Sequence, residues 1–111
     1  NGDISKWNVS AVTNMSYMFR SAAAFNGDMS EWEGKVSAVT DMSHMFRDAS
    51  SFSSDLSRWD VSNCTAMTCM FWGASAFTSD LSHWDVSNCR YYTSSDTFHD
   101  LIGIYIIFFP G

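Results

Sequence analysis

The chain has 111 residues, of which 46% are hydrophobic and 16% aromatic, and twelve acidic residues outnumber six basic ones to give a net charge of -6. This length fits one small domain, and the composition is sufficient for a hydrophobic core. The few basic residues are spread along the chain, which argues against a nucleic-acid partner. No secretory signal is visible at the start, and no apolar run reaches the ~18 residues of a membrane helix. We therefore expect no membrane insertion by this segment.

A motif that runs from an aspartate to a tryptophan four residues later occurs four times. Its tryptophans are Trp7, Trp32, Trp59 and Trp84, which are separated by 25, 27 and 25 residues. A regular step between ~20 and ~50 residues is typical of stacked repeats. We divide the single domain, 1–111, into repeats 3–27, 28–54 and 55–79, a partial repeat 80–100 and an apolar tail, 101–111.

The two ends of the chain lead to separate expectations. The opening Asn1-Gly2-Asp3 matches Asn26-Gly27-Asp28 in the middle of the array, so the chain starts at a repeat boundary. This start predicts that the sequence is part of a longer protein. The apolar tail has three interpretations: a strand that covers the last repeat, a truncated anchor, or a sequence that belongs to no native fold.

The first half of each repeat carries the spacing of a strand. In the third repeat, apolar residues at i, i+3, i+5 and i+8 are Leu56, Trp59, Val61 and Cys64. This spacing is that of the strand half of a leucine-rich repeat. We expect these residues, including all four tryptophans of the array, to point into the core and the residues between them to face outward. The second repeat has two more residues here, and Gly34 among them suits a β-bulge.

The second half of each repeat changes to a helical spacing. In the first repeat, Val12, Met15, Met18, Phe19 and Ala22 form one apolar stripe on a helix. Thr13 precedes most of this stripe and can cap a helix N-terminus. The predicted fold class is therefore α/β: a right-handed, leucine-rich-repeat-like solenoid with one short parallel strand and one short helix per coil of about 25 residues.

The strings from Trp7 to Met15 (WNVSAVTNM) and from Met18 to Ala22 (MFRSA) resemble those of one known family. They are similar to the BspA-like leucine-rich-repeat surface proteins, in the branch that contains mycoplasma surface-lipoprotein repeats of unknown function. The resemblance covers residues 1 to about 89, and the sequence departs from the pattern at Arg90. It implies a cell-surface or secreted array that serves adhesion or partner binding.

Two sets of residues could carry metal or redox chemistry. Asp3, Asp28, Asp55 and Asp80 share one register and could form a calcium ladder, although we favour aspartates that each accept N–H groups in their own turn. Cys64 and Cys89 replace a valine of the first two repeats, which indicates buried thiols, with a disulfide between them left open. His44, His83 and His99 lie in different registers and have no ligand spacing. We expect no metal and no cofactor.

No motif for catalysis is present, and we predict that the protein is not an enzyme. The residues expected on the outer side of the strands vary in charge between repeats, which favours recognition over a structural spacer that only projects another domain. We predict an extracellular or cell-surface module that binds a protein or glycan. The predicted binding residues are Lys6, Asn8, Glu31, Glu33, Lys35, Arg58, Asp60, His83 and Asp85. Three sequons, at Asn8, Asn14 and Asn63, matter only in a host that glycosylates.

Overall fold

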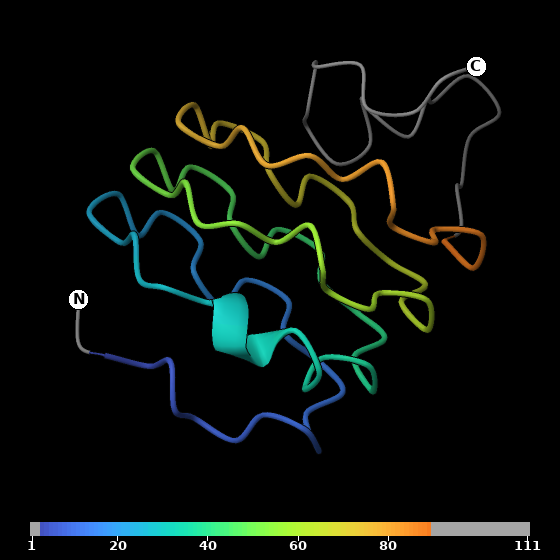
Figure 1. Ribbon diagram of the computed structural model, residues 1–111. Coiled ribbons are helices and arrows are strands. Elements are labelled where there is room, and N and C mark those ends of the chain that lie inside the picture. The colour runs from blue at the N-terminus through green and yellow to red at the C-terminus, as the bar shows by residue number, and fades with distance from the viewer. Residues whose placement is uncertain (1–2, 90–111) are drawn as a thin grey trace, which may run out of the picture.

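The computed structural model describes residues 3–89. Successive repeats lie side by side, and each follows a path similar to that of the repeat before it (Figure 1). Within residues 3–89 the backbone consists mostly of turns, with one 3-10 helix, η1 (Ser30–Trp32), and two isolated parallel bridges, Asn14↔Asp41 and Asp41↔Ala66. The bridges join repeat 1 to repeat 2 and repeat 2 to repeat 3.

The core consists of equivalent aromatic side chains that stack from repeat to repeat. The ring centroids of Phe25 and Phe52 lie 5.9 Å apart, and the row continues to Phe77 at 5.8 Å. A second phenylalanine row, from Phe19 through Phe46, has a centroid distance of 5.5 Å. The rings are nearly parallel, with interplanar angles of 5° to 7° in these pairs. Each repeat therefore buries its aromatic residues against its neighbours.

The tryptophans add a hydrogen bond to this stacking. The indole N–H groups of Trp32, Trp59 and Trp84 each donate to a carbonyl oxygen of the preceding repeat, at 3.1, 3.4 and 2.9 Å. All three rings are buried, and Trp32 stacks on Trp59 at 6.2 Å. Trp7 is the exception, because no repeat precedes it in the described chain, and 51% of it is exposed. The expectation that all four tryptophans lie in the core is wrong for Trp7.

The predicted strand segments have the expected burial but a different backbone. Leu56, Trp59, Val61 and Cys64 are all buried, which confirms the inward positions. The backbone, however, turns twice here, because Trp59 N–H donates to Leu56 O and Cys64 N–H donates to Val61 O. These two bonds close one turn at each end of the segment. Residues 56–64 therefore do not form the extended strand that we predicted.

The predicted helices are also replaced by another structure. Residues 13–21, 40–48 and 65–73, here called the Met-Phe segments, contain turns, and the first two segments donate backbone hydrogen bonds to the next repeat. Tyr17 and Ser21 have φ angles of 63° and 60°, in the left-handed region, which interrupts an α-helix. Only part of the predicted apolar stripe reaches the core: Met15 is buried and Phe19 and Ala22 pack against the core. The stripe is wrong for Val12 and Met18, which are exposed.

The extra residues of repeat 2 produce η1 and a turn rather than the expected bulge in a strand. Glu33 N–H donates to Ser30 O at 3.3 Å, and Lys35 N–H donates to Trp32 O at 2.8 Å. A side chain at Gly34 would meet no atom within 4 Å. Val36 returns to the core and is fully buried. The insertion is therefore accommodated at the surface without disturbing the packing.

Replacing Trp59 with alanine should lower the free energy of unfolding by roughly 3–5 kcal/mol, because the ring is 3% exposed and stacks on Trp32. Trp7→Ala is the matched control and should cost less than about 1 kcal/mol, since that ring is half exposed. Urea denaturation followed by circular dichroism would measure both values. Equal losses for the two variants would contradict this packing.

Candidate functional site

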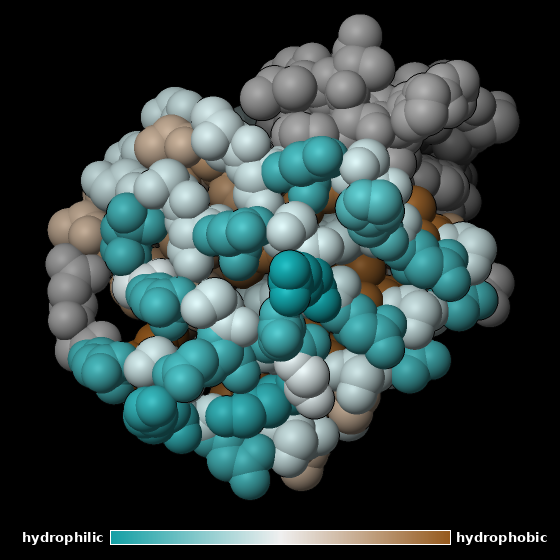
Figure 2. Space-filling view, viewed as in Figure 1, coloured by the Kyte–Doolittle hydropathy of each residue, from teal (hydrophilic) through white to brown (hydrophobic). Residues whose placement is uncertain are grey.

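The nine predicted binding residues lie on the surface, between the buried positions of each repeat. Eight are exposed and Lys35 is half-buried, and we call the set the outer row: Lys6, Asn8, Glu31, Glu33, Lys35, Arg58, Asp60, His83 and Asp85. Figure 2 shows a face on which hydrophilic side chains predominate and hydrophobic ones are visible mainly between them. The outer row could therefore contact a partner without unfolding the core.

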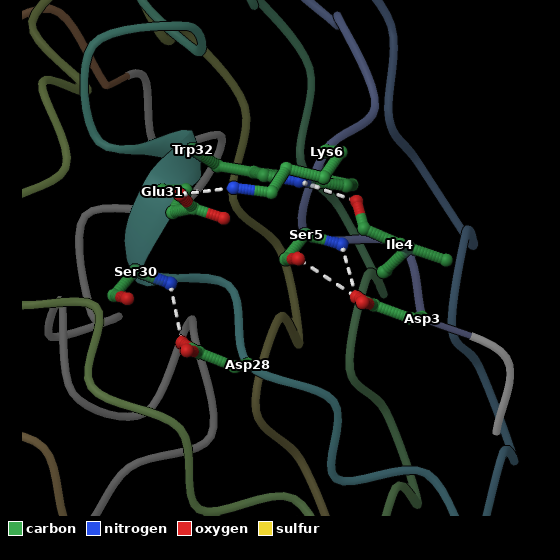
Figure 3. Close-up of polar contacts among 8 residues, drawn as sticks. All are labelled: Asp3, Ile4, Ser5, Lys6, Asp28, Ser30, Glu31 and Trp32. Atoms are coloured by element: carbon green, nitrogen blue, oxygen red, sulfur yellow. Dashed lines mark hydrogen bonds and ion pairs between the residues drawn. The ribbon is translucent and has the colours of Figure 1, made fainter.

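One ion pair links the outer row across two repeats. Lys6 Nζ lies 3.1 Å from Glu31 Oε1, and both side chains are well exposed (Figure 3). An exposed pair of this kind contributes little stability, typically ~0–1 kcal/mol. Both charges therefore stay accessible to a charged partner, and a partner can replace this bond with its own.

The second register of the outer row has a structural task that the sequence interpretation missed. Asn8, Asp60 and Asp85 each accept the backbone N–H of the serine two residues later, and that serine's hydroxyl also donates to the same oxygen. Such Asx turns fix the local backbone. The signal was present in the sequence, because an aspartate or asparagine is followed by a serine at i+2 in each case.

The four aspartates of the possible calcium ladder form the same kind of turn. Asp3, Asp28, Asp55 and Asp80 each accept the N–H of the serine at i+2 at 2.9 Å; two of these turns are drawn in Figure 3. The hydrogen bonds of Ser57 lower the pKa of Asp55, with a further contribution from the Ser79 hydroxyl. Neighbouring aspartates have a smaller effect on these pKa values. In Asp28, the charge of Asp3 raises the pKa, but the hydrogen bonds from Ser30 lower it by more.

A polar groove of about 280 Å³ lies between repeats 2 and 3. Its lining residues are Asn26, Gly27, Asp28, Ser53, Ser54 and Asp55. Asn26 and Ser53 close one side through two hydrogen bonds, of 3.1 and 2.8 Å. Within the described residues, no group of three His, Cys, Asp or Glu side chains is arranged to hold a metal ion.

The remaining candidates lie apart from the outer row or outside the described range. His44 stacks on Tyr17 with a centroid distance of 4.6 Å, and His99 and the apolar tail 101–111 lie outside the described residues. Cys64 and Cys89 are buried free thiols, as expected for core positions. The pKa of Cys89 is raised by its hydrogen bond with Cys64 and by its burial. This thiol is therefore a poor nucleophile at neutral pH.

A family profile described as "Mycoplasma protein of unknown function, DUF285" matches residues 1–101. The chain belongs to the DUF285 family. The match includes the region after Arg90, where the resemblance drawn from the sequence ended. Comparison of this DUF285 chain with curated proteins and with solved structures gives no match. Among its described residues, no helix has the length and apolar character needed to cross a membrane.

Acid should destabilise the protein through its Asx turns. Six aspartates, namely Asp3, Asp28, Asp55, Asp60, Asp80 and Asp85, have pKa values lowered by hydrogen bonds from serine. The folded-state pKa values of these aspartates lie below their unfolded-state values. The stability that the aspartates contribute is therefore fully present above pH ~3.9 and is lost as the pH falls through the folded-state pKa values. Thermal melts from about pH 7 to about pH 2 should therefore show a falling midpoint.

The matched variant for this prediction is the triple change Asp28→Asn, Asp55→Asn and Asp80→Asn. Asparagine keeps the oxygen acceptor of an Asx turn but does not titrate. The variant should fold at neutral pH and lose less stability in acid than the unmodified chain. An identical acid profile would show that these turns do not supply the pH dependence.

Calcium should not bind specifically to the aspartate register. Each carboxylate is already used by its own turn, and Asp28 and Asp55 meet only at an open groove. Titration calorimetry with calcium chloride should give no saturable heat. A micromolar site that disappears in Asp55→Asn would contradict this expectation.

Proposed function

We propose that the protein is a non-catalytic recognition module whose outer row binds a protein or glycan at a cell surface or in the extracellular space. The observation that carries the proposal is the first register of this row, where Lys6, Glu31, Arg58 and His83 are all exposed at equivalent positions. Charge alternates along it, from positive to negative to positive. A partner with alternating charge or several hydroxyl groups would complement such a surface.

The neighbouring register supports this surface mechanically. The Asx turns at Asn8, Asp60 and Asp85 begin two residues after Lys6, Arg58 and His83 and fix the backbone that follows them. A rigid surface loses little conformational entropy when it binds. The small hollow beside it, about 30 Å³ and lined by Ser30, Glu33, Asp55, Arg58 and Trp59, can admit roughly one water molecule. The proposed contact is therefore extended and shallow.

We propose the architecture that accompanies this function to be a right-handed, leucine-rich-repeat-like solenoid of the BspA-like kind. Its support is the repeated stacking of equivalent residues and the membership in DUF285. Repeat arrays of this kind present long exposed surfaces rather than deep pockets. A structural spacer is the competing function, and the change of residue type along the first register favours recognition over it.

Charge reversal of the outer row should reduce binding without unfolding the protein. Arg58→Glu combined with Glu33→Lys changes two exposed side chains that no Asx turn uses. We avoid reversal at Asp60, because that change would also break its turn with Ser62. Binding to a glycan array and to immobilised extracellular-matrix proteins should fall at least about tenfold, as expected when charged contacts are reversed.

The control is Arg20→Glu, an exposed change on a Met-Phe segment that should leave binding intact. Melting temperatures of both variants should stay close to that of the unmodified chain, since surface changes are usually nearly neutral. Loss of binding in Arg20→Glu alone would place the docking surface on the Met-Phe segments. A folded chain that binds no probe on either surface would favour the spacer.

A further inference from the structure

The two buried cysteines, Cys64 and Cys89, lie on equivalent turns of repeats 3 and 4. Cys64 N–H donates to Val61 O at 2.9 Å, and Cys89 N–H donates to Val86 O at 3.0 Å. Repeats 1 and 2 carry a valine at the cysteine position. Two neighbouring repeats therefore each place a thiol at the same point of the same local structure, inside the core.

Hydrogen bonds between the two repeats hold these turns in register. Asn88, which precedes Cys89, donates from its side-chain amide to Ser62 O at 2.7 Å. Earlier in the same stretch, the indole of Trp84 donates to Leu56 O at 2.9 Å. Both donors are side chains with carbonyl partners in repeat 3, so they fix repeat 4 on repeat 3 without restricting the thiols themselves.

The spacing between repeats suits a disulfide between the two cysteines. Equivalent aromatic rings of neighbouring repeats have centroid distances of 5.5 to 6.2 Å. The Cα atoms of a disulfide are usually about 4.4–6.8 Å apart. Cys89 Sγ lies 3.5 Å from Cys64 O, and the two thiols are hydrogen-bonded to each other. A bond between the sulfur atoms therefore requires little movement of the backbone.

Cys69 differs from this pair in position and in exposure. It lies in a Met-Phe segment, at the position that His44 occupies in repeat 2, and it is partly exposed. Cys64 and Cys89, by contrast, are both buried. Cys69 is therefore a control within the same chain, because it is the more accessible thiol but has no cysteine at the equivalent position of a neighbouring repeat.

We propose that Cys64 and Cys89 form a redox-sensitive pair, which hydrogen peroxide converts to a disulfide between repeats 3 and 4. Both thiols are buried, so the oxidant has to be small and uncharged, and hydrogen peroxide meets both requirements. The disulfide joins residues 25 positions apart in the sequence and holds repeat 4 on repeat 3 covalently. This cross-link is independent of what the outer row binds.

Cys64 is the thiol that reacts first. The hydrogen bond from Cys89 lowers the pKa of Cys64, whereas the pKa of Cys89 is raised. The Cys64 thiolate attacks one oxygen of hydrogen peroxide, the O–O bond breaks, and the hydroxide that leaves takes the Cys64 proton to become water. The Cys89 sulfur then attacks the sulfenic acid on Cys64. The S–S bond forms, the S–O bond breaks, and the hydroxyl leaves with the Cys89 proton as a second water.

Treatment of the reduced full chain with hydrogen peroxide, followed by peptide mass spectrometry and thermal melts, tests the proposal. The unmodified chain and Cys69→Ser should each gain a Cys64–Cys89 disulfide. Their melting temperatures should rise by at least about 5 °C, because the closed loop restricts the unfolded chain. Dithiothreitol should reverse both changes. Cys64→Val and Cys89→Val introduce the valine of repeats 1 and 2 and should show neither change.

The same treatment in concentrated urea is the control for pairing that is directed by the fold. In the unfolded chain, bridges should include Cys69, because it is the cysteine nearest to Cys64 in the sequence. Circular dichroism should show that the valine variants are folded, and alanine replaces valine if they are not. Three free thiols after oxidation, a bridge through Cys69 in the folded chain, or an equal rise of the melting temperature in Cys64→Val would each overturn the proposal.

Discussion

The structure depends on contacts between residues that occupy the same position in successive repeats. Phenylalanine stacks on phenylalanine, Trp32 stacks on Trp59, and each buried indole donates to the repeat before it. These contacts replace the regular strands and helices that usually satisfy a backbone. The Met-Phe segments supply further backbone hydrogen bonds between neighbouring repeats. A repeat in this protein is therefore incomplete alone and complete only between neighbours.

The sequence was sufficient to locate the core but not to give the backbone conformation. Spacing identified Leu56, Trp59, Val61 and Cys64 as buried, because apolar residues at fixed intervals must share one side of any regular path. The same spacing could not distinguish a helix from a ribbon of turns in the Met-Phe segments. The left-handed backbone conformation of Tyr17 and Ser21 excludes the helix, and neither tyrosine nor serine is a residue type that predicts this conformation.

The candidate surface was predicted in the same partial way. Exposure of the outer row followed from the positions between buried residues, and the structure places eight of its nine members at the surface. The role of Asn8, Asp60 and Asp85 in turns did not enter that prediction, although the serine at i+2 is a readable signal. Trp7 was misplaced because each buried indole packs on the repeat before it, and no repeat precedes Trp7 among the described residues.

The first register of the outer row varies in residue type, whereas most residues of the second register close turns, and this difference affects how the surface can change. A residue that closes an Asx turn tolerates little except Asp or Asn, whereas its neighbour in the first register is free to take any polar side chain. Lys6, Glu31, Arg58 and His83 illustrate this freedom. Repeats 1, 3 and 4 thus each combine one variable position with one fixed turn, whereas repeat 2 has Glu33 in place of the turn residue. Binding preference could then be altered one repeat at a time, with no cost to the stack beneath.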